Sequence, residues 1–86
     1  MAGVLMKDEL TIIVRNGDEE QAFTMCYGDY FKALYEKVYE AYGIDKLDQP
    51  KYAIYEPSGM KLPKTAQIYN VAEVSDGIIC ELKQRG

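Results

Sequence analysis

The sequence predicts an α+β fold, a mixed sheet of four or five strands with one amphipathic helix packed across one face. Three observations predict it: strand-like alternation over residues 10–15 and 21–26, helical spacing of apolar residues over 30–42, and short apolar runs in the second half. A hairpin and one amphipathic helix bury themselves only if the helix crosses the sheet. We expect residues 1–7 to be a flexible N-terminal segment and residues 8–86 to be one folded domain.

The first two strands are predicted to form an antiparallel hairpin. Residues 10–15 alternate in character with a period of two, which is typical of a half-buried strand. Asn16-Gly17 follows, and this pair is the strongest short hairpin signal because both residues accept positive φ. In residues 21–26, Phe23 and Met25 share the face that we expect to meet the core. The tip of the hairpin is acidic, Asp18-Glu19-Glu20.

A helix is predicted from Tyr30 to Tyr42, with Asp29 as its N-cap and Gly43 as the residue just past its end. Packing on the sheet must supply most of the stability of so short a helix. The residues predicted to share its apolar face are Phe31, Leu34, Tyr35, Val38 and Tyr42. We interpret the aromatic stripe of Tyr35, Tyr39 and Tyr42 as the helix–sheet boundary, with hydroxyls that reach water.

The segment after the helix is predicted to hold two short strands. Tyr52–Tyr55 is the first, and Pro57-Ser58-Gly59 is a turn. Met60–Leu62 is expected to be a brief edge strand ended by Pro63, because proline removes a ladder donor. Residues 64–71 are expected to be irregular or to form a short helical turn.

The last strand is predicted over Ile78–Leu82, after a turn at Asp76-Gly77. Ile78, Cys80 and Leu82 fall on one face of this strand. We expect it to pair parallel beside the first strand, which then lies in the interior of the sheet. The apolar outward residue Ile13 fits that less exposed position.

Composition excludes several classes of function. Without histidine, neither a Ser-His-Asp nor a Cys-His nucleophile system can form, and no His-ligated zinc site either. Ten Lys+Arg against fourteen Asp+Glu give a net charge of -4, which disfavours nucleic-acid binding. The sequence has no apolar run of about 18 residues, so we expect no membrane insertion. We therefore expect a non-catalytic cytoplasmic protein without cofactor or metal, with the nucleus as an alternative location.

The two cysteines, Cys26 and Cys80, fall on the strands expected to flank the first strand. Two strand spacings separate them by about 9.5 Å, which exceeds the reach of a disulfide. We interpret both as small packed hydrophobic residues.

Four short motifs, in order along the chain, resemble those of one known family. Tyr42-Gly43-Ile44 resembles the Gly-Ile that ends the ubiquitin helix, and Asp48-Gln49 precedes the third strand as in ubiquitin. Tyr69-Asn70-Val71 resembles the Tyr-Asn-Ile before the last strand, and residues 82–86 resemble the Leu-Arg-Leu-Arg-Gly tail. Over residues 9–86 the chain therefore resembles the ubiquitin superfamily, whose fold is the β-grasp.

The resemblance also implies a recognition surface, and this chain departs from it. The hydrophobic patch of ubiquitin matches Ala53, Ile79, Glu81 and Gly17, so smaller or charged residues replace several of its large apolar ones. Ubiquitin-receptor binding through this patch is therefore not expected. The diglycine of a standard conjugating tail is absent, but the ubiquitin-fold modifier uses a single terminal glycine such as Gly86.

Two non-covalent branches of the superfamily also look similar. The strand Tyr52–Tyr55 and the turn Asp76-Gly77 resemble the N-terminal lobes of talin-type FERM proteins and the Ras-binding-type domains of engulfment and motility scaffolds. This implies a protein–protein interaction module in the N-terminal part of a larger scaffolding or signalling protein, with a Ras-family GTPase as one partner class. The expected partner-binding residues are Arg15, Lys32, Lys37, Ala53, Tyr55 and Ile79. The alternative is a protein modifier that ubiquitin-type conjugation enzymes join through Gly86.

Overall fold

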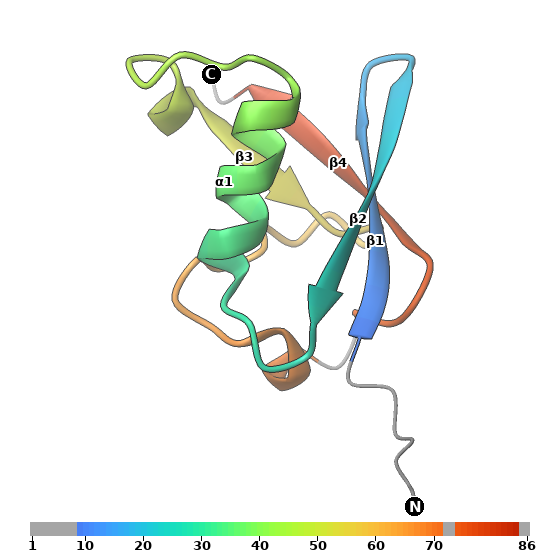
Figure 1. Ribbon diagram of the computed structural model, residues 1–86. Coiled ribbons are helices and arrows are strands. Elements are labelled where there is room, and N and C mark those ends of the chain that lie inside the picture. The colour runs from blue at the N-terminus through green and yellow to red at the C-terminus, as the bar shows by residue number, and fades with distance from the viewer. Residues whose placement is uncertain (1–8, 72–73, 85–86) are drawn as a thin grey trace, which may run out of the picture.

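The computed structural model describes residues 9–71 and 74–84, so the expected N-terminal segment and Gly86 lie outside the described residues. Within these two segments, four strands form one sheet in the order β2-β1-β4-β3 (Figure 1). The strands are β1 Glu9–Asn16, β2 Glu19–Cys26, β3 Tyr52–Tyr55 and β4 Ile78–Gln84. Strand β1 pairs antiparallel with β2 and parallel with β4, and β3 pairs antiparallel with β4. The predicted mixed sheet is confirmed, including the parallel pairing that leaves β1 between two neighbours.

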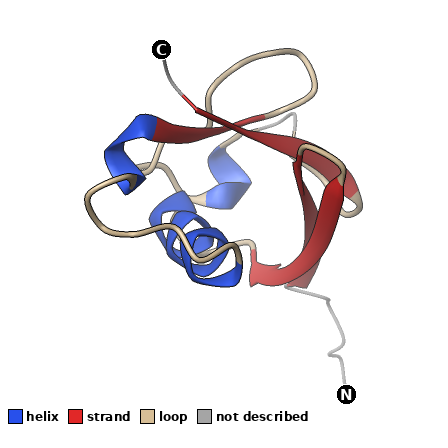
Figure 2. Cartoon of the chain, turned by 90° about the horizontal axis from the view of Figure 1, so that it is seen from above, coloured by secondary structure: helices blue, strands red, loops and turns tan. Residues whose placement is uncertain are grey.

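Helix α1, Phe31–Ala41, packs across one face of the sheet, and the sheet curves around it (Figure 2). The core fills the space between them, because alternate side chains of each strand point toward the helix. The predicted inward faces of the hairpin and of the last strand are confirmed. The core residues that the helix and the strands contribute are Leu10, Ile12 and Val14 of β1, Phe23 and Met25 of β2, Phe31, Leu34, Tyr35, Val38 and Tyr39 of α1, Ile54 of β3, and Cys80 and Leu82 of β4.

The start of α1 differs from the prediction. Asp29 is not the N-cap of the helix. The cap position is Tyr30, whose side chain makes no capping hydrogen bond. The Asp29 carboxylate instead accepts the N–H of Cys26 at 2.9 Å. The first helical N–H groups donate to a loop far along the chain. Phe31 N–H bonds the carbonyl of Ala66 at 3.0 Å, and Lys32 N–H bonds that of Lys64 at 3.2 Å. Tertiary structure thus satisfies donors that a side chain usually satisfies.

The end of α1 matches the prediction at Gly43. Its φ of 66° places it in the left-handed region, where glycine carries no steric penalty. Gly43 N–H bonds the carbonyl of Glu40 at 3.2 Å, and Ile44 N–H bonds that of Tyr39 at 2.9 Å. This pair of bonds is a Schellman motif, which stops the helix at a defined residue.

The segment after β3 also differs in part. Met60–Leu62 is not a strand: Lys61 makes one isolated bridge with Tyr55, and Leu62 N–H bonds the Ile54 carbonyl at 2.8 Å. Pro63 follows directly and has no N–H with which to continue the pairing. Short 3₁₀ helices occur at Gln49–Lys51 and at Ile68–Asn70, and the second is the helical turn expected in this region.

The two cysteines are both free, on the strands that flank β1. Cys80 is buried, as interpreted, but the interpretation of Cys26 as a packed residue is wrong, because it is exposed. Cys26 alternates with Met25, so its side chain lies on the face of β2 that points away from the core.

Candidate protein-binding surface

The face of the sheet turned away from α1, here called the outer face, carries a short apolar strip. The strip consists of Ala22 on β2, Ile13 on β1 and Ile79 on β4, which lie in register across three strands. Ile13 is half-buried and Ala22 is exposed, while Ile79 keeps 41% of its surface exposed. Ile79, a β-branched apolar residue, is therefore exposed to solvent on a strand that has neighbours on both sides, and not at the tip of a loop.

A charged row crosses the outer face beside the apolar strip. It runs from Glu20 on β2 through Arg15 and Glu81 to Tyr55 on β3. The Arg15 guanidinium donates from Nε to Glu20 Oε2 at 2.9 Å, and this bond, helped by the charge of Glu20, raises the pKa of Arg15. Lys83 Nζ lies 3.4 Å from Glu81 Oε1 and 5.6 Å from the ring centroid of Tyr55. Exposed pairs of this kind contribute only about 0–1 kcal/mol, so a partner could replace them at low cost.

Ile79 of the apolar strip and three residues of the charged row, Arg15, Glu81 and Tyr55, line a groove of about 590 Å³. Three of the expected partner-binding residues, Arg15, Tyr55 and Ile79, line this groove together. Ala53 lies on the same face, opposite Lys83, but it is fully buried, so a partner cannot reach its side chain. The structure therefore brings half of the expected residues into one accessible site.

The turn after β3 forms a wall of the groove and is held by Glu56, a carboxylate only 4% exposed. Glu56 accepts the N–H of Ser58 at 2.6 Å and also the Ser58 hydroxyl. The hydrogen bond with Ser58 lowers the pKa of Glu56 below its ordinary value. The ionised carboxylate thus fixes the turn that shapes the groove.

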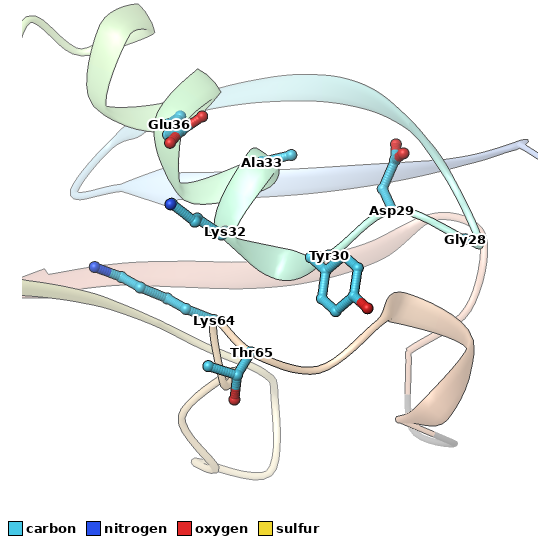
Figure 3. Close-up of a pocket in the computed structure, with 8 residues that line it drawn as sticks. All are labelled: Gly28, Asp29, Tyr30, Lys32, Ala33, Glu36, Lys64 and Thr65. Atoms are coloured by element: carbon cyan, nitrogen blue, oxygen red, sulfur yellow. The ribbon is translucent and has the colours of Figure 1, made fainter.

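Lys32 and Lys37 do not join this site, because both lie on α1, across the sheet from the outer face. Lys37 Nζ donates to the carbonyl of Thr24 on β2 at 3.4 Å. Lys32 lines a separate cleft of about 600 Å³ where α1 begins (Figure 3).

The cleft at the start of α1 has balanced charge. The ammonium groups of Lys32 and Lys64 lie on one side of it, and two acids, Asp29 and Glu36, also line it (Figure 3). Lys64 Nζ lies 5.0 Å from the ring centroid of Tyr35. Because loop carbonyls already accept the first N–H groups of the helix, the helix start offers no free donors to an anion. Sequence reasoning missed this cleft, since no local motif shows that residues 64–65 lie beside the helix start.

The aromatic stripe of α1 is structural. The Tyr35 hydroxyl donates to the Leu62 carbonyl at 2.6 Å and accepts the Ile54 N–H at 3.2 Å. Tyr39 and Tyr42 donate to backbone carbonyls of Gln49 and Val14, and burial raises the pKa of all three tyrosines. The stripe lies at the helix–sheet boundary, and its three hydroxyls all donate to backbone carbonyls.

Other chemistry finds no support in the described part of the chain. Within residues 9–71 and 74–84, His, Cys, Asp and Glu side chains form no group of three that could hold a metal ion. Among the helices of these same segments, none is long and apolar enough to cross a membrane. Conjugation through Gly86 stays a prediction, because that residue lies outside the described segments.

Comparison with known proteins rests on structure. No family model matches the chain, and no curated protein matches its sequence. A de novo design based on ubiquitin superposes with a TM-score of 0.76 at 19% identity, over 92% of each chain. A crystal structure of ATBAG1 in complex with HSP70 superposes with a TM-score of 0.73 at 12% identity, over 88% of this chain and 40% of the matched chain. With the strand order and the helix across the sheet, these likenesses show that the chain has the ubiquitin-like β-grasp fold.

Proposed function

We propose that the chain is a non-catalytic protein–protein interaction module that binds its partner through the outer face. The fold itself hosts many functions, so the proposal rests on the site. The observation that carries it is Ile79, a partly exposed isoleucine that belongs to the apolar strip and lines the groove. An apolar centre with a polar rim is the usual anatomy of a protein interface.

The charges of the outer face favour a partner without a strong net charge at the contact. Arg15 of the charged row is held by Glu20, and the nearby Lys83 by Glu81, so each of these two cations already has an acid beside it. A basic site would select a partner with a strongly acidic surface. Such a surface would meet the carboxylates of Glu20 and Glu81 here, which disfavours that partner. A Ras-family GTPase remains one partner class to test, by titrating its GTP-loaded form and following the backbone signal of Arg15.

We further place this module in a larger scaffolding or signalling protein of the cytoplasm. The match to the structure of ATBAG1 in complex with HSP70 supports only the larger size, since the matched region covers 40% of the matched chain. The structure in which ATBAG1 occurs also contains HSP70, which makes a protein partner a reasonable class for the module.

The proposal is tested by Ile79→Asp, which puts a charge into the apolar strip. Leu47→Asp is the matched control, because Leu47 is 89% exposed and does not line the groove. Each variant and the unmodified chain would be immobilised, and proteins retained from a cell lysate would be quantified by mass spectrometry. Proteins that the unmodified chain and Leu47→Asp retain should fall at least about tenfold with Ile79→Asp.

The same retained proteins with Ile79→Asp as with the unmodified chain would refute binding through the outer face. A backbone amide spectrum of each variant establishes first that the fold is intact. If both variants lose the same proteins, the retention depends on general surface charge and the proposal fails as well.

A further inference from the structure

Within residues 9–71 and 74–84, strand β2 leaves one edge of the sheet open, since it is the terminal strand in the order β2-β1-β4-β3. The hairpin closes with the pair Asn16 and Glu19 across a two-residue turn. Hydrogen-bonded pairs then alternate from that closing pair, so Glu20, Ala22 and Thr24 direct their N–H and C=O groups away from β1. The bond from Lys37 Nζ to the Thr24 carbonyl at 3.4 Å agrees with this direction.

The open stretch of this edge is short and has a defined end. Cys26 N–H donates to the Asp29 carboxylate at 2.9 Å, and the Cys26 carbonyl accepts the Asp29 N–H at 2.9 Å. Asp29 therefore closes the edge at its C-terminal end. The segment left for pairing is Glu20–Thr24, long enough for three residues that face outward.

We propose that this segment pairs antiparallel with the same segment of a second copy of the chain, about a two-fold axis at Ala22. In this register Ala22 faces Ala22 of the second copy, and Glu20 faces Thr24 of the second copy. All of these residues direct their backbone groups outward, so each facing pair forms hydrogen bonds in both directions. The small alanine at the axis lets the two strands approach without a steric conflict.

The placement of charge selects this antiparallel arrangement of two copies. Acidic residues stand at one end of β2, at Glu19 and Glu20, whereas its other end is uncharged. A parallel pairing would set carboxylates against carboxylates, which is destabilising. The antiparallel register sets Glu20 against Thr24 and Glu19 against Met25, next to the place where Lys37 reaches the edge. Lys37 would leave the Thr24 carbonyl and meet Glu19 of the second copy.

The apolar strip of the outer face is a second reason to expect that two copies pair at this edge. Ala22 is the edge member of the apolar strip, followed by Ile13 and Ile79. Pairing at Ala22 joins the strips of both copies into one apolar row over the six central strands of an eight-stranded sheet. The contact itself is one pair of short strands, smaller than a standard interface of about 1,600 Å², so we expect weak, concentration-dependent association.

Sedimentation velocity of the full chain between about 10 μM and 1 mM tests the proposal, since weak pairs dissociate in this range. We expect a monomer–dimer equilibrium, with amide hydrogens of Glu20, Ala22 and Thr24 more protected at high concentration. Ala22→Glu and Ala22→Lys should each abolish dimers, because two like charges then meet at the axis. An equal mixture of these two variants should restore them. Lys83→Glu is the control: it changes the charge of the same face away from the edge and should leave dimers unchanged.

Three results would overturn the proposal. One is a monomer throughout this concentration range, and another is a dimer that Ala22→Glu leaves intact. The third is protection of the edge amides only when a different protein is added, which would assign the edge to a foreign strand. A dimer lost with Ile79→Asp but kept with Ala22→Glu would place self-association on the outer face and would likewise refute pairing at the edge.

Discussion

Single hydroxyl and carboxylate groups hold together parts of this molecule that are distant in sequence. The Tyr35 hydroxyl is the clearest case, because it bonds backbone groups of both Leu62 and Ile54 from within the core. A tyrosine at that position is thus a connector between α1, β3 and the segment after β3. The sequence places Tyr35 on the buried face by its spacing, but spacing says nothing about where the hydroxyl goes.

Tyr35→Phe should destabilise the fold by about 1–3 kcal/mol, because it leaves a buried carbonyl and a buried N–H without their partner. Tyr69→Phe is the matched control. Its hydroxyl bonds Gln67 at 2.9 Å on a residue that is 59% exposed, so the change should stay within about 0.5 kcal/mol. Urea denaturation of both variants measures the difference, and equal stabilities would contradict the role given to Tyr35.

Elements of this fold end where backbone conformation or side-chain bonding forces them to end. Gly43→Ala should cost about 1 kcal/mol or more, because alanine must adopt a positive φ of 66° at the helix end. Nothing lies within 4 Å of a Cβ added there, so the cost is conformational rather than steric. Gly28→Ala, equally uncrowded and without a positive φ, should be neutral or slightly stabilising. Thermal unfolding that shows the two variants to be alike would contradict this account.

The turn after β3 should respond to acid through Glu56. Its pKa is lowered in the folded chain, so the unfolded chain takes up the proton first as pH falls. The stabilisation is therefore complete above the ordinary pKa of 4.5 and is lost as pH falls through the lower folded value. The urea concentration at the midpoint of unfolding should fall between pH 5 and pH 2.5. This fall should be smaller for Glu56→Gln than for the unmodified chain. Parallel declines in the two proteins would show that Glu56 does not contribute.

At the scale of the whole molecule, the thiol of Cys26 should react in the folded state, whereas the thiol of Cys80 should react only after the chain unfolds. Cys26 is exposed, whereas burial in the core raises the pKa of Cys80 to about 11. Reaction with a thiol reagent should therefore label Cys26 fast and Cys80 at least roughly a thousandfold more slowly, since Cys80 must wait for global unfolding. Cys26→Ser should leave the slow phase alone. Two fast thiols in the native chain would contradict the burial of Cys80.

The architecture was predictable because its signals are local. Alternation at Ile12 and Val14, the turn at Asn16-Gly17 and the glycine at position 43 each act within a few residues. The predictions that were wrong concern features that depend on contacts between segments distant in sequence. Asp29 has the chemistry of an N-cap, yet the turn after β2 takes its carboxylate while a loop caps the helix.

The candidate site was predictable only in part for the same reason. Arg15 and Ile79 could be placed on the outer face by their alternation, whereas the full burial of Ala53 depends on its neighbours across the sheet. The open edge of β2 and the cleft beside Lys64 also follow from tertiary arrangement, which no single stretch of sequence encodes.

The loop that caps α1 has a consequence for how the chain is made. The helix start needs the carbonyls of Lys64 and Ala66, which leave the ribosome more than thirty residues after Phe31. A nascent chain that stops before residue 64 therefore holds a helix with unsatisfied first donors, which should fray. Folding of this domain is then expected to wait until Ala66 has been synthesised, so the hairpin and α1 should not be stable on their own before that point.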